Sequence, residues 1–236
     1  MNIVLFEAGE LSSDHTITLT GRRYEHLQSV LKCTEGDQVR VGVINGGKGI
    51  GKVLDANAAS LKLQVELVED PLPPHPTTLV LALPRPKMLR RILRSCAEFG
   101  VQDLHIVHSY RVEKSFWQSP LLQPQKIQQA LLTGLERSGD TRLPTVTLHR
   151  RFKPFIQDHL EETANGKPIF ILHPGGYPSM ESAFTDPQLI MIGPEGGFIP
   201  YEVDLACSAG AQPRSLGPRI LSVDTAVPAI LGRALP

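Results

Sequence analysis

The feature that most constrains the fold of this chain is an alternation of short apolar runs and amphipathic segments after residue 76. Apolar runs typical of buried strands occupy residues 78–83, 104–107, 168–172 and 188–192, with a less regular one at 212–216. Segments with helical spacing occupy residues 86–99, 124–137, 152–162, 200–209 and 222–233. Strands that alternate with helices in this way predict an α/β domain whose parallel sheet is covered by helices on both faces.

The first 70 residues have a different, β-rich pattern. Strands are expected at residues 3–6, 16–20, 37–44, 49–54 and 61–68. The last of these carries an apolar residue at every second position from Leu61 to Leu67, which indicates one buried face. One helix is expected over Arg22–Lys32, and one of its faces is formed by Tyr24, Leu27, Gln28 and Leu31. Five short strands and one helix predict a small β-barrel.

A proline-rich segment separates the two patterns. Asp70–Pro76 contains four prolines in seven residues, which cannot continue a sheet or a helix and which form a stiff linker. We therefore predict two domains, residues 1–72 and residues 73–236.

Charge is distributed unevenly, although the formal net charge is +0 with 24 basic and 24 acidic residues. Residues 73–153 hold 13 Lys or Arg against 5 Asp or Glu, whereas the parts on either side are acidic. A basic middle favours an anionic partner such as nucleic acid. A solvated surface that has no partner is the alternative.

Several protein classes are not expected. No apolar run reaches the roughly 18–20 residues that span a membrane, and the N-terminus lacks the features of a secretory signal. We expect a cytoplasmic protein. The cysteines, Cys33, Cys96 and Cys207, are odd in number and far apart, which predicts inert thiols and neither a disulfide framework nor a zinc site.

The predicted helix over residues 86–99 has one strongly basic face. The spacing of Lys87, Arg90, Arg91 and Arg94 places them in one stripe, and Arg85 precedes it. Like charges at this spacing repel, so the stripe is better explained by contact with phosphates than by solvation alone. For Arg137 the alternative is a favourable interaction with a helix C-terminus. The full set of candidate RNA-binding residues is Arg22, Arg23, Arg85, Lys87, Arg90, Arg91, Arg94, Arg111, Arg137 and Arg142.

Three glycine- and proline-rich loops follow predicted strands, at residues 172–176, 193–198 and 215–221. In α/β sheets, ligands bind outside the carboxyl ends of the strands, where glycine allows close approach of the backbone. No glycine-rich dinucleotide motif and no phosphate-binding lysine loop is present, so a nucleoside held by main-chain groups is favoured over a set of tight turns. His105 and His108 point to opposite faces of a strand, so no metal site is expected there.

The motifs Ile192–Phe198 and Leu216–Leu221 resemble those of the ribosomal RNA small subunit methyltransferase E family, in the SPOUT superfamily. Residues 81–84, 97–101 and 136–139 support the resemblance, which extends over nearly the whole chain. It implies a PUA-like β-barrel followed by a SPOUT α/β domain with a C-terminal trefoil knot. It also implies a homodimer, S-adenosyl-L-methionine as methyl donor, and N3 of a uridine in 16S rRNA of the small ribosomal subunit as acceptor.

The resemblance also implies site residues. The positions that match the cofactor pocket are Leu172, His173, Pro174, Ile192, Gly193, Gly196, Leu216, Gly217, Pro218, Ile220, Leu221 and Thr225. One difference is that Ser222–Asp224 replaces the usual Arg-Thr-Glu.

Three residues are candidates for catalysis. Our hypothesis is that Arg219 stabilises negative charge on the uracil, and that Asp224 or Glu195 assists removal of the proton. The alternatives are a structural ion pair for Arg219 and capping of loop amides for Glu195.

Two other functions remain open. The chain could be a non-catalytic or retargeted RNA-binding protein with the same fold, which the change at residues 222–224 favours. It could also be an enzyme for a small phosphorylated metabolite, although the missing phosphate-binding lysine argues against this.

Overall fold

The computed structural model describes residues 2–235. The chain forms two compact units. Unit 1 contains the chain up to Pro73 together with Leu132–Leu143, and unit 2 contains Pro74–Leu131 and the chain from Pro144 onward. Helix α3 (Pro124–Ser138) therefore begins in unit 2 and ends in unit 1.

Unit 1 is built on a five-stranded mixed sheet. Its strands are β1 (Val4–Phe6), β2 (Thr16–Leu19), β3 (Gln38–Val43), β4 (Lys48–Ala56) and β5 (Leu61–Glu69). They pair in the order β1-β3-β4-β5-β2, and only the β1–β3 pair is parallel. All five predicted strands are confirmed. The alternation in β5 buries Leu61, Leu63 and Val65, whereas Leu67 is 39% exposed.

The predicted helix of unit 1 is confirmed in position but changes its geometry. The α-helical part, α1, is Gly21–His26, and a π-helical turn, η2, continues over Leu27–Leu31. A π turn advances less per residue than an α turn, so the expected buried face is not maintained. Leu27 is buried in the core of the sheet, but Leu31 is 53% exposed. The face that the sequence assigns to Tyr24, Leu27, Gln28 and Leu31 is therefore not buried as a unit.

Unit 2 contains a six-stranded, fully parallel sheet, as predicted. Its strands are β6 (Thr77–Ala82), β7 (Asp103–Val107), β8 (Thr145–His149), β9 (Ile169–Leu172), β10 (Gln188–Ile192) and β11 (Gln212–Arg214). They pair in the order β11-β9-β10-β6-β7-β8. The sequence did not predict β8, because this edge strand is largely exposed and lacks an apolar run.

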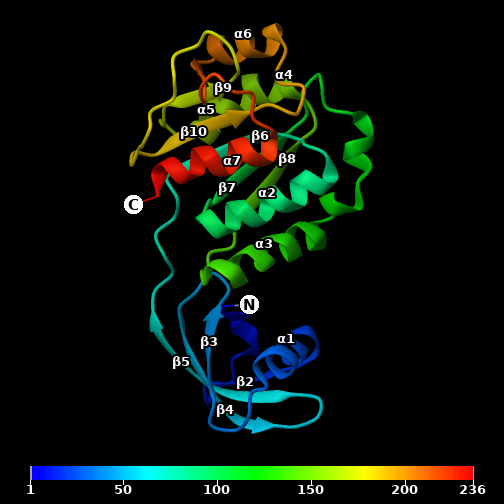
Figure 1. Ribbon diagram of the computed structural model, residues 1–236, viewed down its shortest axis with the longest axis vertical. Coiled ribbons are helices and arrows are strands. Elements are labelled where there is room, and N and C mark those ends of the chain that lie inside the picture. Colours follow the sequence, from blue (N-terminus) through cyan, green and yellow to red (C-terminus); the bar gives the residue numbers. More distant parts are fainter. Residues whose placement is uncertain (1, 236) are drawn as a thin grey trace. The chain divides into compact units, whose positions relative to one another are not determined.

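Helices cover both faces of this sheet (Figure 1). Helices α2 (Pro86–Phe99) and α7 (Val223–Leu231) lie side by side on one face. The other face carries α4 (Phe152–Pro154), a π-helical turn η5 (Phe155–His159), α5 (Leu160–Ala164) and α6 (Pro200–Ser208). Short 3-10 turns occur at residues 8–10, 114–118, 120–122 and 232–234. None of the helices over residues 2–235 is both long and apolar enough to cross a bilayer.

Helix α2 has the bounds that the sequence predicts. Pro86 occupies its first turn, and Gly100 ends it with a left-handed φ of 80°, a conformation that favours glycine. Its apolar face is buried and includes Cys96. Burial raises the pKa of the Cys96 thiol to about 12, so this thiol is inert at neutral pH. Cys33 is also buried, Cys207 is half-buried, and all three thiols are free.

A histidine cluster lies where β7, β8 and η5 meet. Nδ1 of His105 lies 3.0 Å from Nε2 of His149, and the two rings are stacked. Phe155 and His159 also lie against the ring of His149. Burial, and then the neighbouring His105 and His159, lower the pKa of His149 to about 4. Burial also lowers the pKa of His105, which Asp103 raises and Lys167 lowers further.

This cluster predicts that acid destabilises the protein. The unfolded chain binds a proton at His149 below pH 6.5, whereas the folded chain resists protonation until about pH 4. The contribution of His149 to the free energy of unfolding is therefore fully present above pH 6.5 and is lost as the pH decreases from 6.5 to about 4. The expected loss at this site is about 1 kcal/mol after allowance for solvent screening. Urea unfolding at pH 7 and pH 5 measures it: His149→Phe should flatten the dependence, and His15→Asn should not.

Candidate functional site

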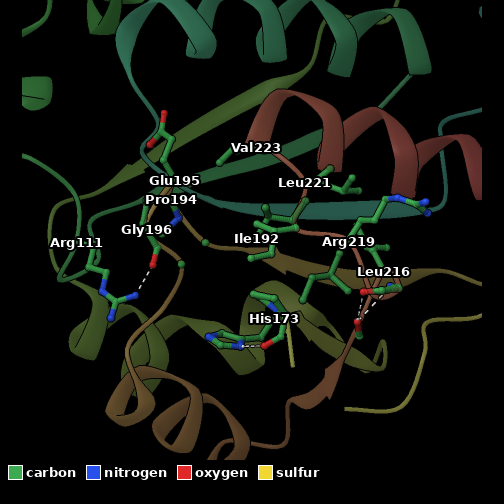
Figure 2. Close-up of a pocket in the computed structure, with 18 residues that line it drawn as sticks. Arg111, His173, Ile192, Pro194, Glu195, Gly196, Leu216, Arg219, Leu221 and Val223 are labelled. Carbon is green, nitrogen blue, oxygen red and sulfur yellow. Dashed lines mark hydrogen bonds between the residues drawn. The ribbon is translucent and has the colours of Figure 1, made fainter. Parts of the chain in front are cut away.

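A cavity of about 270 Å³ opens at the carboxyl ends of three neighbouring strands, β11, β9 and β10 (Figure 2). Each strand contributes the loop that follows it, and Arg111 enters from the loop after β7. The lining residues are Arg111, Leu172, His173, Pro174, Ile192, Gly193, Pro194, Glu195, Gly196, Gly197, Ser215, Leu216, Gly217, Arg219, Ile220, Leu221, Val223 and Ala226. The structure thus brings together the three loops that the sequence singled out.

Most of the residues that match the family's cofactor pocket line this cavity. The exceptions are Pro218 and Thr225, which are not among the lining residues. Both are exposed, and Oγ1 of Thr225 lies 3.0 Å from Oγ of Ser222 at the start of α7. Roles for these two residues rest on the resemblance and not on their position at the cavity.

Hydrogen bonds fix the backbone of the loops around the cavity. The N–H of Gly197 donates to Pro194 O at 2.8 Å, and the guanidinium of Arg111 donates to Gly196 O (Figure 2). The loop after β11 is held at Ser215, whose hydroxyl accepts from the N–H of Gly217 at 3.1 Å. The loops after β10 and β11 therefore have a defined backbone conformation around the cavity.

The lining combines aliphatic side chains and main-chain groups with the side chains of Arg111, His173, Glu195 and Arg219. Aliphatic side chains from all three loops line the cavity, and no lysine is among the lining residues. A Cβ built on Gly217, which has a φ of 123°, meets nothing within 4 Å, so the backbone there faces open space. These properties fit a nucleoside held by backbone groups better than a phosphate.

The three candidate catalytic residues occupy different places. Glu195 and Arg219 both line the cavity and lie at opposite ends of it (Figure 2). Oε1 of Glu195 accepts from the backbone N–H of Arg85 at 3.1 Å. Arg85 is the residue before α2. Asp224 lies in the first turn of α7, is not among the lining residues, and has Oδ2 3.7 Å from Nη1 of Arg91.

The basic stripe lies on the exposed side of α2. Arg85, Lys87, Arg90 and Arg91 are exposed, whereas Arg94 is half-buried. Nε of Arg94 is buried and has no hydrogen-bond partner within residues 2–235. Because the N–H of Arg85 is bonded to Glu195, the stripe begins at the edge of the cavity.

The remaining candidate cations have partners within their own units. Arg22 forms a bidentate ion pair with Glu136, and Arg23 forms an ion pair with Glu10. Nε of Arg142 donates to Leu72 O at 2.8 Å. Arg137 lies at the end of α3, and its carbonyl accepts from Asn2. These contacts give each of the four residues a structural role beside any contact with RNA.

Sequence reasoning did not identify Glu202, which connects the loop after β7 to the start of α6. Its side chain is only 3% exposed, and Oε2 accepts from the N–H of Ile199 at 3.0 Å. Oε1 accepts from the N–H of Tyr110 at 2.7 Å, on the loop after β7. A glutamate three residues after the start of a helix is a capping signal, but the contact with Tyr110 spans 92 positions and could not be predicted from it.

Within residues 2–235 there is no group of three or more His, Cys, Asp or Glu side chains that could hold a metal ion.

Two family models match the chain. The model described as an RNA methyltransferase domain matches residues 71–235, and the model described as an RNA methyltransferase PUA domain matches residues 19–66.

Full-length relatives and a solved structure agree with these matches. Ribosomal RNA small subunit methyltransferase E of Treponema pallidum is 32% identical over 233 residues, covering 96% of this chain and 87% of the relative. The protein of the same name from Synechocystis is 30% identical, covering 94% and 73%. The fold is similar to a crystal structure of the Neisseria gonorrhoeae protein of this name bound to S-adenosyl methionine, with a TM-score of 0.77, 20% identity, and coverage of 98% and 95%. This chain therefore belongs to the RNA methyltransferase family that includes the ribosomal RNA small subunit methyltransferase E proteins.

Proposed function

We propose that this chain transfers a methyl group from S-adenosyl-L-methionine to N3 of a uridine in 16S rRNA of the small ribosomal subunit. One observation carries the proposal: the basic stripe of α2 begins at the edge of the cavity, joined to it by the bond from Arg85 to Glu195. A nucleoside-sized site beside a row of cations suits a cofactor next to a polyanionic substrate. Family membership and the names of the relatives support the same activity.

The residues present fit the proposed cofactor. When bound, it supplies a reactive methyl group, so the protein has to bind, orient and exclude water. Leu172, Ile192 and Leu216 would bury the adenine, and the amides and carbonyls of residues 193–197 and 215–217 would bond its polar edges.

Replacing Gly196 is expected to weaken cofactor binding. A Cβ at this position would lie 2.9 Å from Cδ and 3.3 Å from Cβ of Arg111, so the arginine must move and lose its bond to Gly196 O. Loss of one charge-assisted hydrogen bond corresponds to about a tenfold increase in Kd. Calorimetric titration of Gly196→Ala with S-adenosyl-L-methionine measures this. Gly176→Ala is the matched control, because a Cβ there meets nothing within 4 Å; an unchanged Kd for Gly196→Ala would contradict the assignment.

The chemical step needs a proton acceptor, because uridine N3 carries a proton before it attacks. We propose that Arg219 stabilises the negative charge that develops on a uracil oxygen. Glu195 is the favoured proton acceptor, since it lines the cavity and uses only one carboxylate oxygen for Arg85. Because it lies at the other end of the cavity from Arg219, it would accept the proton through water. Asp224 is the weaker candidate, because it lies outside the lining and is paired with Arg91.

Several finer features are also part of the proposal. Residues 1–72 would form an RNA-binding domain whose sheet closes as a PUA-like barrel, and residues 73–236 the methyltransferase domain. The matched ranges 19–66 and 71–235 support this division. The family resemblance supports a C-terminal trefoil knot, a homodimer and a cytoplasmic location, where small subunits are available. Light scattering tests the dimer, and the main-chain trace of a crystal structure tests the knot.

A second candidate function is a non-catalytic or retargeted RNA-binding protein. The pairing of Asp224 with Arg91 favours this second function. Asp224 stands where the family usually has a glutamate, and its carboxylate is engaged in a structural contact. Tritiated methyl transfer to small subunits from a strain that lacks the modification separates the two functions. Mass-spectrometric mapping of 16S rRNA, with and without the protein, then identifies the base. One added methyl group on N3 of a single uridine supports the first function, and no methyl group, or one on another base, supports the second.

A further inference from the structure

Two exposed tyrosines lie next to the buried Glu202, on separate elements of unit 2. The side chain of Tyr110 is 77% exposed in the loop after β7, and that of Tyr201 is 54% exposed in the first turn of α6. Glu202 directly follows Tyr201, and its Oε1 accepts from the backbone N–H of Tyr110 at 2.7 Å. One carboxylate therefore brings together two aromatic residues that are 91 positions apart in the sequence.

Hydrogen bonds and burial hold the backbone before and after Tyr110. The neighbouring Ser109 is only 1% exposed, and the N–H of Val112 donates to Ser109 O at 3.0 Å, which closes a turn around Tyr110. The base of the same loop is held by the indole of Trp117, which donates to Nδ1 of His108 at 2.9 Å. Aromatic rings on an ordered backbone lose little freedom on binding, which favours a binding role over a chance exposure.

The loop that carries Tyr110 also contributes a residue to the cofactor cavity. Arg111 follows Tyr110 directly, lines the cavity and donates to Gly196 O. On the other side, Glu202 also caps the N-terminus of α6 through Ile199, in the segment that continues from the cavity loop. The backbone segments that carry the two tyrosines therefore adjoin segments that form the cavity.

We propose that Tyr110 and Tyr201 form a stacking platform for unpaired bases of the substrate RNA that flank the target uridine. This inference rests on the proposed function and identifies the contact that holds the RNA beside the cofactor. Bases in single-stranded RNA stack on tyrosine rings whatever their sequence. The exposed cations Arg111 and Lys114 would meet the phosphates that connect the stacked bases. Glu202 is a positioning residue, because its buried carboxylate bonds the backbone of Tyr110 and caps the start of the helix that carries Tyr201.

The test uses the full-length protein with methyl transfer to unmodified small subunits. For the double variant Tyr110→Ala/Tyr201→Ala we expect the KM for subunits to rise at least about tenfold. We expect kcat at saturating subunits and the Kd for S-adenosyl-L-methionine to stay within about threefold, because neither ring lines the cavity. Tyr110→Phe/Tyr201→Phe keeps both rings and should behave as the wild type. Leu148→Ala, which removes an exposed apolar side chain of β8 in unit 2, is the control.

Failure of this inference is distinct from failure of the proposed function. An active wild type whose KM is unchanged in the double alanine variant would overturn only the platform. Equal impairment of the phenylalanine and alanine variants would also overturn it, because the hydroxyls and not the rings would then matter. A wild type that does not methylate subunits would reject the proposed function. The same variants would then be compared by fluorescence anisotropy with a labelled twelve-nucleotide oligouridylate, and equal binding by wild type and double alanine variant would reject the platform as well.

Discussion

Replacing Arg219 by alanine is expected to lower the rate of methyl transfer by about 10²–10³-fold, the effect of removing one group that stabilises developing negative charge. The Kd for S-adenosyl-L-methionine should remain within about threefold, because the aliphatic and main-chain walls of the cavity persist. Single-turnover methyl transfer to unmodified small subunits, together with calorimetric titration of the cofactor, measures both quantities.

The competing explanation for Arg219 is a structural ion pair. The residue is exposed, and among residues 2–235 its side chain forms no ion pair or hydrogen bond. The variant should therefore melt at the temperature of the wild type. Lys153→Ala, which removes an exposed cation of α4 in unit 2 outside the cavity lining, is the control for a general loss of positive charge. Full activity of Arg219→Ala, or loss of activity that parallels a loss of stability, would remove Arg219 from the chemical step.

Replacing Glu195 by glutamine is expected to lower kcat by about 10²–10⁴-fold, the usual contribution of a positioned general base. Glutamine can still accept the hydrogen bond from the N–H of Arg85 through its amide oxygen, so the loop should keep its shape. Its amide cannot accept a proton, so increasing the pH should restore part of the rate as uridine N3 ionises in solution. The pH–rate profile of single turnovers measures this recovery.

The matched variant for Glu195→Gln is Asp224→Asn. It also removes one carboxylate, but from a residue that is paired with Arg91 outside the lining of the cavity. We expect its kcat to fall less than about fivefold, the small effect of a partly exposed ion pair. The opposite ranking of the two variants would assign the proton acceptor to Asp224 and would make Glu195 a loop-capping residue.

The layout of the sheet and the location of the cavity could be predicted because each rests on a local pattern. The strands at residues 188–192 and 77–82 are continuous apolar runs, and the loops that follow strands in a parallel sheet meet at one edge. Helix α2 is bounded by a proline and a glycine whose preferences act over a few residues. Strand β8 was missed because its exposed residues carry no such pattern.

Contacts between distant residues could not be predicted in this way. The pairing of Asp224 with Arg91 depends on how α2 and α7 pack against each other. The bond from Glu202 to Tyr110 depends on which loops lie side by side after the sheet has formed. Periodicity and spacing describe one element at a time. They could not predict that Arg22 pairs with Glu136 and Arg23 with Glu10.

The central claim is that three main-chain loops at the carboxyl ends of β9, β10 and β11 hold the methyl donor beside the basic face of α2. The most direct test is a crystal structure of the protein with S-adenosyl-L-methionine. We expect an adenosyl group enclosed by Ile192, Gly193 and Leu216, with its sulfonium facing the side of the cavity where α2 begins. A donor bound elsewhere, or a cavity that remains closed to it at saturating concentration, would exclude this site.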